Sequence, residues 1–184
     1  MLMGLDMYLS KKTYVKNWQH EPEDGHYTVA VSQGGRPRND IKPARIEYIV
    51  EGVADWRKAN AVHAWFVKNA QDGKDDCRAY PVTREQLTQL REACAKVLAA
   101  STLIEGKITN GYRYENGKET PILENGKLIK DATVAKKILP THDGFFFGST
   151  GYDQYYCDDL VTTRDVLDKV LAEQGDHFEY QASW

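Results

Sequence analysis

The segment Leu5-Asp6-Met7-Tyr8-Leu9-Ser10 alternates apolar and polar side chains along its length. A period of two places every second side chain on the same face of a β-strand. We therefore predict a strand within residues 3–15, with one apolar face that packs into the core. The other predicted elements follow outward from this strand.

The C-terminal residues repeat this alternation, because residues 178–184 read Phe-Glu-Tyr-Gln-Ala-Ser-Trp. We expect this strand to pair within the sheet, since a frayed apolar tail would promote aggregation. Residues 27–31 are rich in β-branched side chains and predict another strand. The Gly34-Gly35 pair lacks the strand-then-helix context of a phosphate-binding loop and indicates a plain turn.

Apolar residues at helical spacing run from about Pro43 to Gln71, and Asp72-Gly73 follows as a stop signal. This spacing predicts one long helix. Its apolar stripe continues through Trp56, Asn60 and His63, so we predict that Asn60 and His63 are mostly buried within a helix centred on residues 56–67.

Two further helices are predicted from their start signals. Thr83, with Gln86 three residues later, forms a capping box for a helix that runs to about residue 100. Thr162, with Asp165 three residues later, has a similar pattern and predicts a helix that ends near Gly175.

Three Asn-Gly pairs, at Asn110, Asn116 and Asn125, lie between these two helices. Asn-Gly between short apolar runs is the strongest short-range signal for a β-hairpin, so residues 103–130 predict a β-ribbon. Phe145-Phe146-Phe147 then predicts a short buried strand, and the tyrosines that follow it fit one face of a short helix.

The chain has 184 residues, of which 41% are hydrophobic and 11% aromatic, so it is too apolar to be disordered. Strands at both ends and helices between them predict a single α+β domain over residues 1–184. We expect a mostly antiparallel sheet packed on two or three helices, with the Asn-Gly ribbon as an elaboration.

Charge is distributed unevenly along the chain. Residues 143–184 hold nine acidic and two basic residues, a balance of −7, whereas the rest of the chain has a balance of +4. The basic residues are spread out and form no concentrated stripe, which disfavours a nucleic-acid-binding function. The acidic third instead favours a partner with a basic surface.

No apolar run approaches the roughly 20 residues needed to cross a bilayer, and the first residues lack the basic lead of a signal peptide. Cys77, Cys94 and Cys157 are odd in number and widely scattered, which is typical of reduced thiols rather than a disulfide framework. We therefore expect a cytoplasmic protein without a membrane anchor, and the sequence specifies no oligomeric state.

Four segments together carry a resemblance to a known group. They are Met-Gly-Leu-Asp-Met-Tyr-Leu at residues 3–9, Trp-Arg-Lys-Ala-Asn to Trp-Phe at 56–66, Gly-Lys-Asp-Asp-Cys at 73–77, and Leu-Pro-Thr to Tyr-Tyr at 139–156. The chain resembles small uncharacterised proteins of bacteriophages, prophages and other mobile elements. The resemblance implies a bacterial host cell and a start at Met3, and it implies no particular chemistry.

His63, Asn60 and Ser149 are the candidate catalytic residues. His63 and Asn60 lie within an apolar stripe, where polar groups need hydrogen-bond partners, so they predict either a polar pocket or an internally satisfied network. Ser149 lies among hydroxyls and glycines at an expected strand end, but it lacks the Gly-x-Ser-x-Gly elbow of a hydrolase nucleophile. The more frequent explanation for all three is structural.

Asp75, Asp76 and Cys77 follow the predicted helix, where they could meet His63 at a metal ion. One cysteine and one distant histidine do not match the ligand spacing of a zinc site. We therefore predict no bound transition metal and no cofactor, with the two acids solvated in a turn.

The acidic third also contains a candidate partner-binding surface, which comprises Tyr152, Asp153, Tyr155, Tyr156, Asp158 and Asp159. Tyrosines anchor protein interfaces and acids steer basic partners, although tyrosines on one helical face also fit a core. The leading hypothesis is an accessory protein that binds a host or defence protein. The alternative is a small enzyme or ligand-binding protein with a pocket around His63, Asn60 and Ser149.

Overall fold

The computed structural model describes residues 4–115, 118–144, 147–175 and 177–184. It contains helices and antiparallel sheets, which confirms the predicted α+β class. The strands are β1 (Asp6–Tyr14), β2 (Ser32–Gln33), β3 (Arg36–Pro37), β4 (Tyr48–Arg57), β5 (Tyr80–Val82), β6 (Leu103–Glu115), β7 (Lys118–Ile129) and β8 (Phe178–Ser183). The α-helices are α1 (Asn60–Asn69), α2 (Arg84–Ala100), α3 (Thr133–Ile138) and α4 (Gln154–Ala172), and short 3-10 helices span Glu23–Gly25 and Pro43–Arg45.

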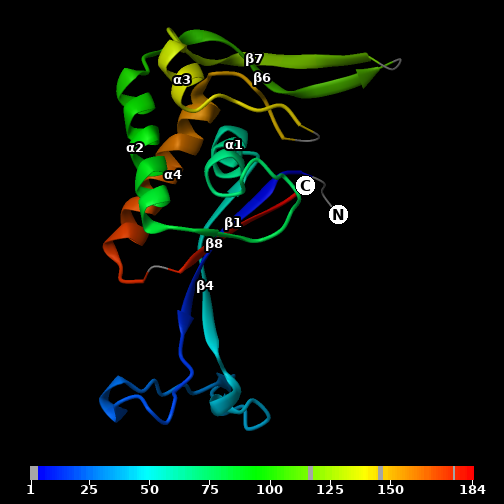
Figure 1. The fold of residues 1–184 in the computed structure, drawn as a ribbon. Coiled ribbons are helices and arrows are strands. Elements are labelled where there is room, and N and C mark those ends of the chain that lie inside the picture. Colours follow the sequence, from blue (N-terminus) through cyan, green and yellow to red (C-terminus); the bar gives the residue numbers. More distant parts are fainter. Residues whose placement is uncertain (1–3, 116–117, 145–146, 176) are drawn as a thin grey trace.

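The main sheet has the strand order β4-β1-β8-β5, and its neighbouring strands are antiparallel. Both terminal strands are therefore central, as their alternating patterns predicted. Met7 and Leu9 are fully buried on one face of β1, and Leu5, just before the strand, is also fully buried. Figure 1 shows α2 and α4 side by side next to this sheet, with the β6–β7 ribbon above and a two-stranded arm below.

One hydrophobic core joins the sheet to α1, α2 and α4. Phe66 of α1 stacks on Tyr180 of β8 with 3.9 Å between the ring centroids. Trp56 of β4 donates from Nε1 to Thr163 Oγ1 of α4 at 2.9 Å. Large apolar side chains that interlock in this way supply most of the stability of a domain. Among the described residues, no helix is both long enough and apolar enough to span a bilayer.

The predicted helix over residues 43–71 is wrong in its first half. Residues 48–57 form β4, which pairs with β1 from Tyr48↔Tyr14 to Arg57↔Asp6. The side chains of Ile49 and Val50 are exposed. The helical spacing of these apolar residues therefore does not correspond to the buried face of a helix. The helix begins only at Asn60, after Lys58 takes a left-handed φ of 61°, and Asp72 and Gly73 stop it with positive φ as predicted.

Two other sequence-based assignments are also wrong. Residues 27–31 form no strand; the short hairpin follows them, with Gly34 and Gly35 in its turn at positive φ. Thr162 does not begin a helix, because α4 runs from Gln154 to Ala172 with Asp153 as its N-cap. An exposed Thr inside a helix, followed three residues later by an acid, produces the same local pattern as an N-cap, which explains the error.

The ribbon is a single hairpin of β6 and β7, and the Asn116-Gly117 pair at its end lies outside the described residues. The Asn110-Gly111 pair forms a bulge, where the register shifts between Thr109 and Tyr112. Asn125-Gly126 is paired within β7. Residues 145–146 of the predicted phenylalanine strand also lie outside the described residues, and Phe147 is buried but belongs to no strand.

Replacing Thr83 with alanine is expected to lower the free energy of unfolding by about 1 kcal/mol, because the capping box of α2 would be lost. Thr162→Ala is the matched control, since Thr162 is exposed inside α4 and caps nothing. Denaturant melts should show a shifted midpoint for Thr83→Ala and almost none for Thr162→Ala. Equal shifts would contradict the capping assignment.

Candidate functional site

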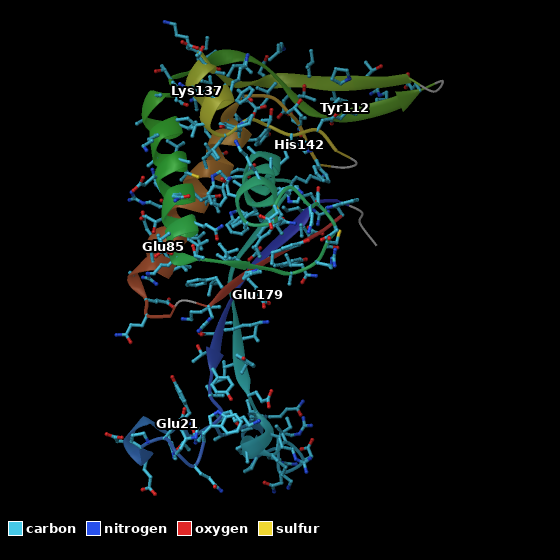
Figure 2. All side chains as sticks on the ribbon, in the orientation of Figure 1. Glu21, Glu85, Tyr112, Lys137, His142 and Glu179 are labelled. Carbon is cyan, nitrogen blue, oxygen red and sulfur yellow. The ribbon has the colours of Figure 1, made fainter. Side chains whose placement is uncertain are left out.

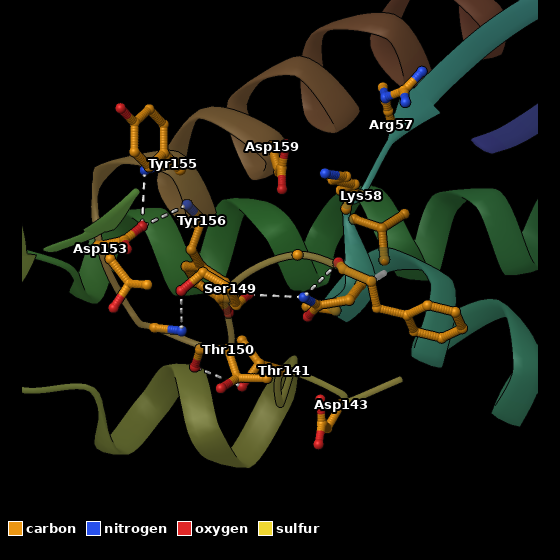
Figure 3. A pocket seen from close by; sticks show the side chains of 18 of the residues that line it. Arg57, Lys58, Thr141, Asp143, Ser149, Thr150, Asp153, Tyr155, Tyr156 and Asp159 are labelled. Carbon is orange, nitrogen blue, oxygen red and sulfur yellow. Dashed lines mark hydrogen bonds between the residues drawn. The ribbon is translucent and has the colours of Figure 1, made fainter. Parts of the chain in front are cut away.

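A cleft of about 1140 Å³ opens beside the N-terminal ends of α1 and α4. Its walls come from four separate parts of the chain: the β4–α1 turn, the bulge of β6, the described parts of the loop at residues 141–144 and 147–151, and the first turns of α4. Figure 3 shows the cleft with labelled residues of the turn, the loop and α4. Small-molecule pockets typically measure about 300–1,000 Å³. The volume of this cleft lies slightly above that range and therefore suits a large ligand or a segment of a partner chain.

Asn60 fixes one wall of the cleft. Its Nδ2 donates to the carbonyl oxygens of Phe147 at 3.2 Å and Ser149 at 2.8 Å, and its Oδ1 accepts from the backbone N–H of His142 at 3.1 Å. The buried amide is thus satisfied by the loop that it holds. Asn60 and Ser149 are brought together, and Asn60 acts by positioning the loop rather than by contacting a ligand.

The loop over residues 148–151 contains two glycines, Gly148 and Gly151, and packs closely against the β4–α1 turn. Gly148 has a φ of 91°, and a Cβ there would come within 3.1 Å of Lys58 Cβ, so only glycine fits this approach without strain. The Ser149 hydroxyl accepts from the backbone N–H of Gly151 at 3.0 Å, and the Thr141 hydroxyl donates to the Thr150 carbonyl at 3.0 Å. These bonds fix the conformation of the loop along the edge of the cleft.

Charged side chains of both signs line the cleft. Arg57 and Lys58 come from the end of β4 and the turn after it, and Asp159 projects from α4 (Figure 3). Burial raises the pKa of the Asp159 carboxyl to about 7, and the negative charges of Asp158 and Asp153 add to the effect. Within the described residues this carboxyl accepts no hydrogen bond and forms no ion pair.

Asp153 is buried at the start of α4. Its Oδ1 accepts from the backbone N–H groups of Tyr155 at 3.0 Å and Tyr156 at 3.2 Å, as an N-cap does. Burial still raises the pKa of this carboxyl above its usual value. Asp153 therefore caps the N-terminus of α4, and Asp159 lies six residues further along the same helix.

Two tyrosines form the aromatic side of the cleft. Tyr112 follows the β6 bulge, and Tyr155 lies in the first turn of α4; both rings are substantially exposed. The Tyr155 hydroxyl donates to Glu124 Oε1 of β7 at 2.9 Å, and Asn110 donates to the other oxygen of Glu124 at 2.8 Å. Bulges often redirect a side chain beside a binding site, and here the bulge places Tyr112 on the cleft.

The six predicted partner-binding residues differ in how far their side chains are exposed. Tyr155 and Asp158 are exposed, whereas Tyr156 and Asp153 are buried. The Tyr156 hydroxyl donates to the Leu139 carbonyl at 2.8 Å, and the half-buried Tyr152 packs edge-on against the Tyr156 ring. Asp159 is half-buried in the cleft. These residues therefore do not form one continuous surface, and only Tyr155 and Asp159 face the cleft from accessible positions.

His63 does not line the cleft, although it lies on the same helix as Asn60. Its side chain is fully buried, with Nδ1 2.8 Å from the Tyr180 hydroxyl and Nε2 3.0 Å from Asp75 Oδ2. Trp184 donates to the other oxygen of Asp75 at 3.0 Å. Burial lowers the pKa of His63 despite the nearby carboxylate. This buried network joins α1, β8 and the loop after α1.

The suggestion of a metal site at residues 75–77 finds no geometric support. The Asp75 carboxylate lies 3.0 Å from His63 Nε2 and accepts a hydrogen bond from Trp184 Nε1. The Asp76 carboxylate accepts hydrogen bonds from Arg78 and from the Tyr80 hydroxyl. Among the described residues, no three His, Cys, Asp or Glu side chains converge to hold an ion. The thiols of Cys94 and Cys157 are buried, which raises their pKa values to about 12 and about 11. Thiols with such values are not nucleophiles.

Sequence reasoning missed Arg57, Lys58 and Tyr112 as cleft residues. The predicted long helix concealed Lys58, because its role depends on the turn between β4 and α1. The bulge at Asn110-Gly111 was the available signal for Tyr112, since an Asn-Gly pair inside a strand often marks a bulge. Comparisons of the chain with protein-family models, with curated proteins and with solved structures found no match.

Proposed function

We propose that this chain is an accessory protein of a phage or another mobile element, which acts by binding a partner protein in the bacterial cytoplasm. The resemblance of four segments to mobile-element proteins supports the genetic context. The three cysteines are free, which is consistent with a reducing compartment. The cleft beside α1 and α4 is the proposed binding site, and a positively charged segment of the partner is its proposed ligand.

The observation that carries this proposal is the Asp159 carboxyl, which is half-buried in a large cleft and has no hydrogen-bond or ion-pair partner among the described residues. A cation placed beside this group would restore its ionised form and regain the energy that burial costs. Tyr112 and Tyr155 add two accessible aromatic rings, which attract ammonium and guanidinium groups. Arg57 and Lys58 on the facing wall favour a segment that also carries an acidic residue.

The alternative, a small enzyme, is supported mainly by the same Asp159. A carboxyl that titrates near neutral pH is suited to donate or accept a proton. Among the described residues, however, His63 is separated from the cleft and Asn60 is fully engaged by the loop. Binding is therefore the better-supported function. In an enzyme, Asp159→Asn would retain substrate affinity and lose turnover.

The test is a titration of the protein with two capped peptides, Ala-Arg-Ala-Glu-Ala and its counterpart with glutamine in place of arginine. We expect binding of the arginine peptide only, at pH 8, with changes in the amide NMR signals of cleft residues. Asp159→Asn should weaken binding at least about tenfold through the lost ion pair. Asp165→Asn, on the exposed side of α4, is the matched control and should bind like the wild type.

Alanine substitutions at two neighbouring tyrosines distinguish an effect on binding in the cleft from an effect on the stability of the core. Tyr155 is 43% exposed, so Tyr155→Ala should leave the melting temperature nearly unchanged while it weakens peptide binding. Tyr156 is 5% exposed, so Tyr156→Ala should cost about 3 kcal/mol of stability. If the arginine peptide binds Tyr155→Ala and Asp159→Asn as tightly as it binds the wild type, the cleft is not its site.

A further inference from the structure

The arm at the opposite end of the molecule from the ribbon extends beyond the main sheet. Strand β8 pairs with β1 only as far as Lys11, whereas β4 pairs with β1 to Tyr14. The arm (residues 12–50) therefore leaves the sheet as two strands and ends in a tip (residues 15–47), which Figure 1 shows far from α2 and α4. Such a projection costs chain entropy that its own contacts must offset.

The tip contains almost no hydrophobic core. Val15 is its one buried apolar residue among the described positions, and from residue 16 to residue 50 the described side chains are half-buried or exposed. Two large aromatic side chains of the tip, Trp18 and Tyr27, remain substantially exposed, and so do Tyr14 and Tyr48, the strand pair that adjoins the tip. The bonds that shape the tip are polar, such as the reciprocal pair between Asn17 and Tyr27 at 2.8 Å. Exposed aromatic clusters of this kind mark interaction surfaces.

Charge divides the tip into two sides. The acidic turn (residues 20–26) carries Glu21, Glu23 and Asp24 without a basic residue other than histidine. The basic loop (residues 34–46) carries Arg36, Arg38, Lys42 and Arg45 against a single acid, Asp40. Figure 1 shows the two 3-10 helices of these segments on opposite sides of the tip, and Figure 2 labels Glu21 on the acidic side.

We propose that the tip is a dimerisation surface, on which two copies of this chain pair about a twofold axis. The acidic turn of each copy lies against the basic loop of the other, and Trp18 and Tyr27 become covered. A twofold interface uses the same patch on both subunits, so it requires a patch that complements itself, and opposite charges on the two sides of one tip meet this requirement.

The composition of the tip favours a second copy over a polyanion. Residues 15–47 carry five basic and five acidic residues, so their net charge is zero and the acidic turn would repel phosphates. The tip spans 33 residues, so an interface of the usual size, roughly 20–30 residues on each side, would use most of it.

The experiment is a charge swap measured by sedimentation of the full chain. One variant combines Glu23→Lys with Asp24→Lys, and the other combines Arg36→Glu with Arg45→Glu. Within the described residues these four side chains make no hydrogen bond or ion pair, so melting temperatures should match that of the wild type. The wild type should dimerise, and each variant alone should dimerise at least about tenfold more weakly.

Mixing the two variants in equal amounts should restore dimers, because the acidic surfaces of one then face the basic surfaces of the other. High salt should weaken the wild-type dimer. Asp159→Asn should leave the dimer unchanged, which separates this surface from the cleft. The proposal is overturned if the wild type stays monomeric, if both variants dimerise like it, or if the mixture fails to associate. Binding of single-stranded DNA by a monomeric wild type would assign the basic loop to nucleic acid instead.

Discussion

Replacing Tyr180 with alanine is expected to lower the free energy of unfolding by about 3–5 kcal/mol, the largest effect of a single substitution considered for this fold. The Tyr180 ring is fully buried and stacks on Phe66, and its hydroxyl lies 2.8 Å from His63 Nδ1. Truncation would therefore create a cavity and leave a buried imidazole nitrogen without its partner. Denaturant unfolding followed by circular dichroism measures the loss.

Tyr180→Phe separates the two contributions, because it keeps the ring and removes the hydroxyl. We expect a loss of about 1–3 kcal/mol from the unsatisfied His63 nitrogen. Tyr8→Ala is the control, since Tyr8 lies on the neighbouring strand β1 with its side chain about half exposed. A Tyr180→Phe protein as stable as the wild type would show that the hydrogen bond between Tyr180 and His63 contributes no stability.

Replacing Asp159 with asparagine is expected to make stability less sensitive to alkaline pH. The folded-state pKa of Asp159 is raised to about 7, above the value of 3.8 that the carboxyl has when exposed. A raised pKa favours the protonated carboxyl in the folded state, so its contribution is present below about pH 4 and lost as pH rises through about 7. The wild type should therefore be less stable than Asp159→Asn at pH 8.5 and about equally stable at pH 4.

The expected difference at pH 8.5 is about 1–3 kcal/mol, which is less than the full pKa shift would give because solvent reaches part of the carboxyl. Asp158→Asn is the control for the loss of one negative charge in this turn of α4, and its effect should be smaller because Asp158 is exposed. Urea melts across this pH range test the prediction. Parallel curves for the wild type and Asp159→Asn would contradict burial as the cause of the shift.

The parts of the fold that could be predicted from sequence are those with a buried face or a specific local bond. Alternation in residues 5–9 and 178–183 predicted β1 and β8, because one face of each strand enters the core. The Thr83 box predicted the start of α2, because its hydrogen bonds involve residues three apart. Each of these signals is contained within a few residues.

The errors arose where local pattern and tertiary pairing disagree. Ile49 and Val50 fit a helical stripe, but they lie in the arm, where pairing with β1 and not burial decides the conformation. The Thr162 pattern resembled a cap because helix starts and helix interiors share Thr and Val at similar spacing. A cap requires extended backbone before the helix, and the backbone at Asp153 has that geometry.

The candidate site was only partly predictable for a similar reason. Asn60 and Ser149 are 89 residues apart, and their hydrogen bond exists only once α1 and the loop over residues 147–151 have packed together. The burial of Asn60 and His63 was confirmed, because an apolar stripe indicates which side of a helix faces inward. The different partners of the two side chains, Ser149 for one and Tyr180 for the other, depend on tertiary structure alone.

The central position of β8 has a consequence for how the chain is made. Residues 178–183 are synthesised after every other element, yet they pair with both β1 and β5, which have no pairing with each other in the main sheet. During translation, β1 and β4 can form their hairpin early, but β5 has no neighbour until β8 leaves the ribosome. The inner edges of β1 and β5, and the Phe66 ring that stacks on Tyr180, therefore stay without their partners until β8 is made, because long-range pairing must wait for its last strand. A chain truncated just before Phe178 is therefore expected to expose these unpaired strand edges and to bind chaperones more strongly than a chain that includes β8.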